Sequence, residues 1–317
     1  MMLCIHHLAV DGVSWRILQE DFETAVKQLN SGEKVVLPEK TASFIEWSNK
    51  LKEYGEKLES SEIEYWKKHN AKIVEGMVAG QCSDNKAVSK KAVLSKETTE
   101  KLLTKSSNAY GAKIDEVLLA GLARAVGRIT GQRNIPVLLE GHGREEIHEP
   151  INIDRTVGWF TNLYAVSLDC STNNDESITN AMDAVRGVPN MGMGYGYTEH
   201  ESEPDICFNY LGDFGETSAS SEYSTGRDTS TENDIGVNLS LNGSVSEGQL
   251  EFHISSKYGK KFTDMLKEEL ENSVNELAEY CASRKSPLTD KINNRSDAER
   301  NIELSYEQLS FDKFFPP

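Results

Sequence analysis

The sequence lacks the features that would indicate a membrane protein, a secreted protein or a nucleic-acid-binding protein. Nowhere in its 317 residues does an apolar run approach the roughly 18–20 residues of a membrane-spanning helix, and the first residues lack the pattern of a signal peptide. The five cysteines are odd in number and form no C-x-x-C pair, which predicts free thiols in a reducing cytoplasm. Bases are scarce: 34 Lys and Arg stand against 51 Asp and Glu, a formal charge of −17. We therefore expect a cytoplasmic protein with neither nucleic acid nor membrane as a partner.

Helix and strand patterns alternate along most of the chain, which predicts an α/β protein. The predicted helices span residues 12–29, 43–57, 60–68, 95–108, 114–129, 177–185 and 261–282. The predicted strands span residues 3–5, 91–94, 134–139, 158–168 and 205–211, followed by a hairpin of 236–245 and 249–255.

Composition divides the chain into three parts. Residues 73–87 lack periodicity and predict a connection, so we expect a first unit at 1–85 and a second at 86–285. Residues 286–317 are polar and poorly patterned, which indicates a linker-like tail. Within the second unit, the Ser- and Thr-rich segment 217–233 predicts a mobile surface loop.

Two adjacent histidines, His6 and His7, follow the first predicted strand and precede Asp11. A metal site would need a third ligand, and no H-x-x-x-H or C-x-x-C pattern lies nearby. Hydrogen-bonded packing and acid–base chemistry both stay open, and the turn that follows favours exposure of one imidazole at a helix start. We expect Asp11 to orient this loop through a buried arginine. Ser14 lies outside a G-x-S-x-G elbow, which argues against a hydrolase nucleophile.

A glutamate, Glu140, directly follows the most apolar predicted strand and precedes Gly141. A carboxylate at the carboxyl end of such a strand, beside glycines that let a ligand approach the backbone, is typical of active sites in open α/β sheets. Partial burial there would raise its pKa. The alternative is a structural glutamate that pairs with Arg144 or Arg155, and the residues alone leave both interpretations open.

Three further segments are rich in aromatic residues and glycine. They span residues 155–161, 189–196 and 207–212, and they contain Trp159, Asn209 and Tyr210. The glycines of 189–196 lack the preceding strand and following helix of a dinucleotide loop. These segments either line a channel or pack in the core.

In this order, the segments resemble the epimerization domains of nonribosomal peptide synthetases, which belong to the condensation-domain superfamily. The resemblance covers Leu3 to about Ala282 and is carried by HHLAVDGVSWRIL from His6, DEVLLAGLARAVG from Asp115, EGHGREE from Glu140, RTVGWFTNLYAVSL from Arg155, PNMGMGYG from Pro189, FNYLGDF from Phe208 and NLSLNGSVSEGQLEF from Asn238. Within the superfamily, EGHGRE and FNYLG favour epimerization over condensation.

The resemblance implies an α/β fold of two chloramphenicol-acetyltransferase-like lobes that share an active-site floor. The family's segment before the histidine motif has no counterpart in the printed sequence, so we expect an incomplete first lobe and impaired activity of this chain. Ala165 also departs from the family, which usually has proline at that position.

The implied reaction is the cofactor-independent inversion of the α-carbon of an aminoacyl or peptidyl thioester. That thioester is held on the phosphopantetheine arm of a peptidyl carrier protein. His7 and Glu140 are the implied acid–base groups, with Glu140 removing the proton, while His6 is expected to pack inward. The implied supporting or substrate-binding residues are His6, Asp11, Ser14, Arg144, Trp159, Asn209 and Tyr210. No bound cofactor and no metal are expected.

Two other functions stay open at this point. A condensation-type acyltransferase would use His7 to activate an amine for peptide-bond formation, and Glu140 in EGHGRE argues against it. A non-catalytic fragment would only bind, or would have no activity.

Overall fold

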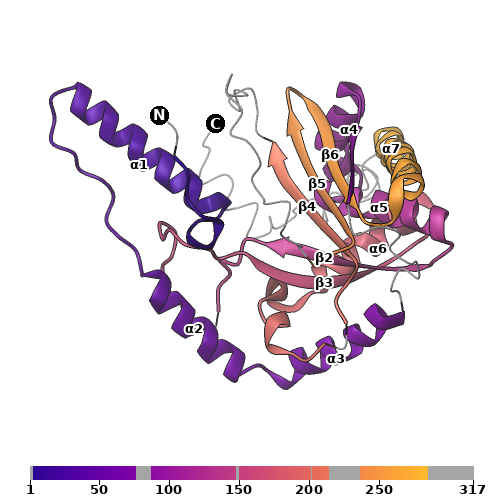
Figure 1. Cartoon of the computed structure of the whole chain (residues 1–317), viewed down its shortest axis with the longest axis horizontal. Coiled ribbons are helices and arrows are strands. Elements are labelled where there is room, and N and C mark those ends of the chain that lie inside the picture. Colours follow the sequence, from indigo (N-terminus) through magenta and orange to yellow (C-terminus); the bar gives the residue numbers. More distant parts are fainter. Residues whose placement is uncertain (1–2, 76–86, 148–149, 201, 214–235, 285–317) are drawn as a thin grey trace, which may run out of the picture.

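The computed structural model describes residues 3–75, 87–147, 150–200, 202–213 and 236–284 (Figure 1). Within these ranges, a helical N-terminal part precedes a six-stranded mixed sheet that is packed with helices. The predicted α/β class is confirmed. The helices of the described ranges are all too short or too polar to cross a membrane.

The N-terminal part consists of one short 3-10 turn and three longer helices that follow one another around the sheet. In chain order these are η1 (His7–Ala9), α1 (Gly12–Asn30), α2 (Phe44–Glu56) and α3 (Ser60–Glu75). The α1 helix begins at Asp11, whose side chain accepts a hydrogen bond from Ser14 N. A capping box of Ser43 and Glu46 starts α2. Figure 1 shows α1 extending away from the sheet.

The sheet has the strand order β1-β6-β5-β4-β2-β3. Its strands are β1 (Val88–Val93), β2 (Asn134–Gly141), β3 (Asn162–Asp169), β4 (Ile206–Asp213), β5 (Leu239–Ser246) and β6 (Gln249–Ser256). The central pairs β2–β4 and β4–β5 are parallel, and the other pairs are antiparallel. The predicted hairpin is confirmed as β5–β6, with Glu247 and Gly248 both at positive φ in its two-residue turn.

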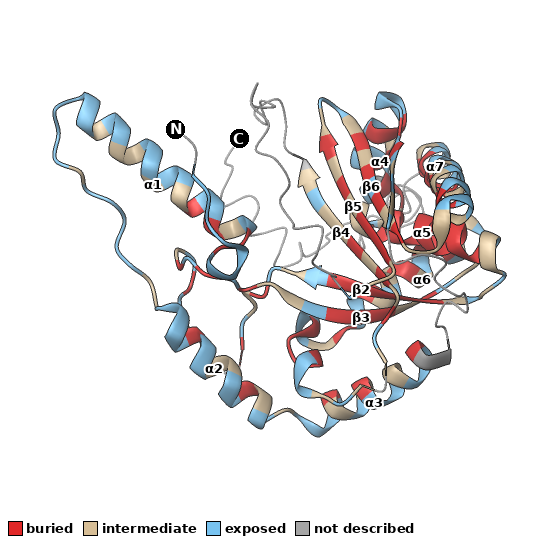
Figure 2. Cartoon of the chain, in the orientation of Figure 1, coloured by how far each residue is buried: buried red, intermediate tan, exposed pale blue. Residues whose placement is uncertain are grey.

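Helices cover one face of this sheet. They are α4 (Lys96–Tyr110), α5 (Ile114–Thr130), α6 (Asn174–Arg186) and α7 (Gly259–Ser283), and the short η2 (Pro189–Gly192) and η3 (Tyr195–Tyr197) follow α6. Figure 1 shows α4, α5 and α7 gathered on one side of β4, β5 and β6. The α5 helix is buried on nearly every side because it lies between the sheet and α7 (Figure 2).

The two faces of the sheet differ in burial. In β5, Leu239, Leu241 and Val245 are fully buried, whereas Asn242 and Ser244 are half-buried. Successive side chains of a strand point to opposite faces, so the first set packs on the helices and the second lies on the other face. We call this second face, which bears Glu140, Asn209, Asn242 and His253, the open face.

Two cores hold the chain together. The main core lies between the sheet and its helices and includes Trp66 and Ile73 of α3. A smaller core packs Trp47 of α2 with Ile153 and Phe160. The helices α2 and α3 are thus attached to the sheet unit, while the predicted boundary at residues 85 and 86 lies outside the described residues.

Some sequence-based predictions are wrong. Residues 3–5 form no strand, and Leu3 is 54% exposed, because no described segment pairs with them. The strand predicted from residue 158 begins only at Asn162, since the backbone N–H groups of Gly158 and Phe160 donate to side chains of the N-terminal part. The predicted connection from residue 73 begins later, because α3 continues to Glu75. Residues 76–86, 217–233 and 286–317 lie outside the described residues.

Candidate active site

Glu140 lies near the carboxyl end of β2 on the open face of the sheet. Leu139 of β2 pairs with Phe208 of β4 in parallel, which brings the following residues, Glu140 and Asn209, side by side. The Asn209 amide donates a hydrogen bond from Nδ2 to Oε2 of Glu140 at 2.8 Å. The sheet therefore brings together two of the predicted site residues.

The structure does not support the alternative that Glu140 is an ion-pair partner of a nearby arginine. Arg144 pairs with Asp11, and Arg155 pairs with two acidic residues of α1. Among the described residues, neither arginine forms an ion pair with Glu140. Its carboxylate is held by an amide instead of a cation, which leaves it able to accept a proton.

Burial raises the pKa of Glu140, and the positive charge of His7 acts in the opposite direction. The residue as a whole is exposed, yet protein atoms surround its carboxylate closely enough to weaken its hydration. A carboxylate with a raised pKa is a stronger base once ionised.

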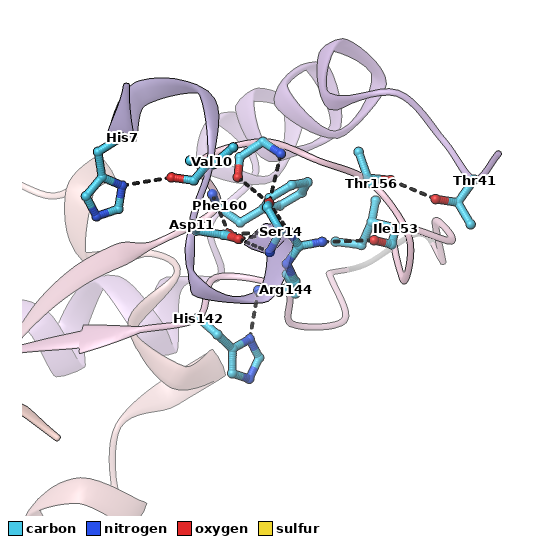
Figure 3. Close-up of polar contacts among 11 residues, drawn as sticks. His7, Val10, Asp11, Ser14, Thr41, His142, Arg144, Ile153, Thr156 and Phe160 are labelled. Atoms are coloured by element: carbon cyan, nitrogen blue, oxygen red, sulfur yellow. Dashed lines mark hydrogen bonds and ion pairs between the residues drawn. The ribbon is translucent and has the colours of Figure 1, made fainter. Parts of the chain in front are cut away.

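His7 presents one ring nitrogen for chemistry. Its Nδ1 lies 2.8 Å from the carbonyl oxygen of Val10, which can only accept, so Nδ1 carries the hydrogen. The proton that His7 can exchange is therefore on Nε2. Trp159 lies beside the imidazole, with ring centroids 6.0 Å apart. Figure 3 shows the His7 ring pointing away from the neighbouring cluster around Arg144.

His6 does not pack inward as expected. Both histidines are exposed in the described chain. His6 caps η1 by accepting a hydrogen bond at Nδ1 from Leu8 N at 3.1 Å. The expectation fails because η1 is a single short turn with no buried residue, so neither imidazole has a core to enter.

Asp11, Ser14 and Arg144 form a buried cluster beside His7 (Figure 3). The Arg144 guanidinium lies 3.3 Å from both Asp11 carboxylate oxygens and stacks 3.7 Å from the Phe160 ring centroid. Asp11 also accepts from Ser14 N at 2.7 Å and Phe160 N at 3.2 Å. The expectation that Asp11 orients the loop through a buried arginine is confirmed, and the arginine is Arg144.

Burial alone would raise the pKa of Asp11. Hydrogen bonds from Ser14 and Phe160 and the charge of Arg144 outweigh that effect, and the pKa lies below its ordinary value. Ser14 has a fully occupied hydroxyl: it donates to Gly158 O at 2.9 Å and accepts from Gly158 N and Arg144. Ser14 is thus a structural link between α1 and the segment before β3.

Two glycines explain how the loop after Glu140 fits so tightly. A Cβ at Gly143 would lie 1.7 Å from the Phe160 carbonyl oxygen, and its φ of +64° suits glycine. A Cβ at Gly141 would lie 2.4 Å from Oδ1 of Asn162. These glycines let the loop approach the segment before β3, which in turn places Arg144 against Asp11.

Tyr210 is not brought to Glu140. It follows Asn209 in β4 and so projects to the opposite face of the sheet, where it packs against the main core. The sequence-based prediction grouped the two residues because both belong to the segment FNYLG, which carries the family resemblance. It also missed Phe160, whose position beside Trp159 in one aromatic segment was the available signal.

A cavity of about 870 Å³ adjoins the site on the β3 side. Its lining includes Leu138 and Leu163 of the sheet, together with Trp159, Phe44 and Trp47. A larger hollow of about 1110 Å³ shares Tyr197 and His200 with it but contains none of the predicted site residues. Among the described residues, no cluster of histidine, cysteine and carboxylate groups could hold a metal ion.

The fold and this site define a condensation-type domain. The family model for the condensation domain matches residues 1–298, and the chain belongs to that family. It is 34% identical over 351 residues to bacitracin synthase 3 of Bacillus licheniformis, covering 100% of this chain and 5% of that protein. It is 32% identical over 321 residues to tyrocidine synthase 1 of Brevibacillus parabrevis, covering 90% of this chain and 30% of that protein. The chain thus spans less than a third of the length of either relative.

Solved structures show the same architecture. The epimerization domain from the third module of tyrocidine synthetase B has a TM-score of 0.76 and 31% identity, covering 87% of this chain and 68% of that one. The first condensation domain of the calcium-dependent antibiotic synthetase has a TM-score of 0.63 at 17% identity, covering 88% and 66%, and shows the fold alone. The chain is thus a condensation-type domain of the nonribosomal peptide synthetase superfamily with the expected chloramphenicol-acetyltransferase-like fold.

Proposed function

We propose that this domain epimerizes the α-carbon of an aminoacyl or peptidyl thioester attached to a carrier protein. The observation that carries the proposal is Glu140 at the end of β2, held by the Asn209 amide at 2.8 Å and without a cation partner among the described residues. His7, with its Nδ1 held by Val10 O, is the second proton-exchanging group, and its charge acts on Glu140. Inversion needs one group to remove a proton and another to return one to the opposite face. The similarity to a solved epimerization domain at 31% identity supports the same conclusion.

In the proposed reaction, the ionised Glu140 carboxylate removes the α-proton, and the C–H electron pair moves into an enolate of the thioester. Protonated His7 then delivers its Nε2 proton to the other face of the α-carbon. The enolate oxygen needs a hydrogen-bond donor, and the Asn209 amide has a second N–H for this purpose. Asn209 thus orients the base through one N–H and stabilises the intermediate with the other.

Each turnover leaves Glu140 protonated and His7 neutral. Both side chains are exposed, so they can exchange protons with solvent and return to their starting states. The tautomer of His7 fixed by Val10 O confines this exchange to Nε2. The residues of the site therefore balance the protons of the reaction without a bound cofactor.

The proposed partner is a peptidyl carrier protein that delivers the thioester on its phosphopantetheine arm. The apolar cavity beside Glu140 offers room for the arm or for the side chain of the reacting residue, because its lining combines Leu163 with aromatic side chains. The tether would hold the substrate at the site, and the polar lining residues Asn162, His200 and Glu203 would contact only the groups that enter the cavity.

The decisive test is the substitution Glu140→Gln in the full protein. The readout is deuterium entry at the α-carbon of a carrier-bound thioester in D2O. We expect a loss of at least about 10²–10³-fold, because an amide cannot act as a general base. Glu145→Gln, in the same loop but paired with His142, serves as the control and should retain exchange.

The same samples distinguish the condensation alternative. A condensation-type acyltransferase would form a peptide bond with an added aminoacyl carrier protein, and it would do so in the Glu140→Gln variant as well. Exchange that survives the substitution, together with peptide formation, would overturn the proposed function.

A further inference from the structure

The open face carries a row of polar side chains beyond those that the proposed reaction uses. Asn209 of β4 lies opposite Asn242 of β5, and Asn242 lies opposite His253 of β6. Residues that lie opposite one another in paired strands project to the same face. The row therefore runs across four neighbouring strands, from Glu140 through Asn209 and Asn242 to His253.

The side chains of this row are accessible on the side away from the helices. Asn242 is half-buried and His253 is exposed, whereas their strand neighbours Leu241 and Phe252 are buried toward the main core. Asn242 donates from Nδ2 to Ser240 Oγ at 3.2 Å. This contact orients the amide along its strand and leaves it an oxygen acceptor and a second N–H for a ligand.

The other side of Glu140 has the opposite character. Across β2 and β3, Glu140 lies opposite Leu163, and Leu138 shares its face. Both leucines line the apolar cavity together with Trp159. The same cavity also has polar lining residues, among them Asn162, His200 and Glu203. Peptide groups placed against the two leucines would lose hydration without gaining hydrogen-bond partners from them, which is unfavourable. The two directions leading away from the carboxylate therefore suit different parts of a substrate.

We infer that Asn242 and His253 bind the peptide chain that precedes the reacting residue, an inference that rests on the proposed function. A carboxamide donates and accepts hydrogen bonds just as a peptide group does. Neighbouring strands lie about 4.8 Å apart, so Asn242 stands roughly 10 Å from Glu140, about three residues of extended peptide at 3.3–3.6 Å each. The substrate class is thus a peptidyl thioester of three or more residues rather than an aminoacyl thioester.

Binding of stable substrate analogues tests this inference without relying on turnover. The probes are pantetheine amides, in which nitrogen replaces the thioester sulfur, carrying one, two, three or four amino-acid residues. Calorimetric titration of the wild-type chain should show affinity rising about tenfold or more between the one-residue and the four-residue probe. This series needs no variant, so misfolding of a variant cannot obscure it.

The variant Asn242→Leu sharpens the test. It removes the amide at nearly constant volume and should weaken the three- and four-residue probes about tenfold, the effect of one hydrogen bond, while the one-residue probe binds as before. The matched control is Asn272→Leu, the same change at an exposed position on α7, which should bind every probe as wild type does.

Three results would overturn the inference. Equal wild-type affinity for all four probes would show that the row does not contact peptide and would leave the proposed function standing. An equal loss for every probe in Asn242→Leu would show that Asn242 acts on the pantetheine or the reacting residue. Failure of all probes to bind wild type would overturn the inference together with the proposed function.

Discussion

Glu140 and His7 belong to the same candidate site, but the structure holds them by different means. Glu140 belongs to β2, which is hydrogen-bonded to β3 on one side and β4 on the other, over fully buried residues such as Val137. His7 belongs to a single exposed turn before α1. The sheet side of the site is fixed by a continuous core, whereas the histidine side is fixed by a few specific contacts.

The apolar residues of α1 reinforce this contrast. Phe22, Val26 and Leu29 follow the spacing of one helix face, yet all three are exposed, with Leu29 at 62%. The α1 helix is therefore anchored mainly at its first turn, through Asp11 and Ser14. The buried hydrogen bonds and the ion pair formed by Asp11 and Ser14 with their neighbours therefore determine where His7 lies relative to Glu140.

The strongest way to break this arrangement is to remove Asp11. We expect Asp11→Ala to destabilise the protein by about 3–5 kcal/mol, because it leaves the buried Arg144 charge without its partner. Urea unfolding at pH 7 measures the change. Asp21→Ala, which removes one partner of a more exposed ion pair with Arg155, should cost no more than about 1 kcal/mol.

The effect of Asp11 also has a defined pH dependence. Because its folded-state pKa is lowered, its contribution is fully present above the unfolded-state value of about 3.9 and is lost as the pH falls through the folded-state value. The stability difference between wild type and Asp11→Ala should shrink in that acidic range. A difference that stays constant with pH would contradict the ion-pair interpretation.

The two histidines should separate in activity. His7→Ala is expected to reduce α-proton exchange by about 100-fold through loss of the Nε2 proton donor. His6→Ala removes only an exposed cap of η1 and should change exchange by less than about threefold, with little change in melting temperature. Deuterium entry and thermal melting of both variants check this, and equal losses in exchange would contradict the assignment of His7.

The raised pKa of Glu140 predicts a smaller effect on the pH dependence of folding stability than that of Asp11, and in the opposite direction. Its contribution to stability is present below the unfolded-state pKa of about 4.3 and is lost as the pH rises through the raised folded-state pKa. Glu140→Gln should therefore melt slightly higher than wild type at pH 7 and equally at low pH.

The same raised pKa predicts the pH dependence of activity. Wild-type exchange should fall about tenfold per pH unit below the folded-state pKa of Glu140, since only the ionised base reacts. Melting curves and exchange rates from pH 3 to 8 test both statements.

The smallest expected effect on stability concerns the exposed face of α1. Replacing Phe22, Val26 and Leu29 with serine should change the free energy of unfolding by less than about 0.5 kcal/mol per position. The same change should reduce self-association, because it removes an exposed apolar stripe. Light scattering measures association, and Ile17→Ser, at a buried position of the same helix, should instead destabilise the fold.

Much of the secondary structure follows from local sequence patterns. The hairpin around Glu247 and Gly248, the helix α4 and the apolar helix α5 depend on residues close together in the chain, so the sequence predicted them. Leu3–Ile5 shows the limit of such patterns, because an apolar triplet does not reveal whether a pairing partner exists.

The candidate site is predictable only in part, for a related reason. Glu140 at a strand end and Asp11 near a buried arginine were both expected from their surroundings. The choice of Arg144 as the partner depends on a contact across 133 positions, and the separation of Asn209 from Tyr210 depends on strand alternation in a sheet. Local sequence contains the candidate groups, but the strand register decides which of them meet.

The position of β2 within the sheet has a consequence for the timing of motions in the site. Backbone amides of β2 and β4 near Leu139 and Phe208 are locked in ladders on both edges, so their hydrogens should exchange with solvent only through large-scale opening of the sheet. The amide of Leu8, bonded only to an exposed imidazole, should exchange orders of magnitude faster. The histidine turn can therefore open many times for each opening of the sheet, so thermal motion should alter the His7 side of the candidate site far more often than the Glu140 side.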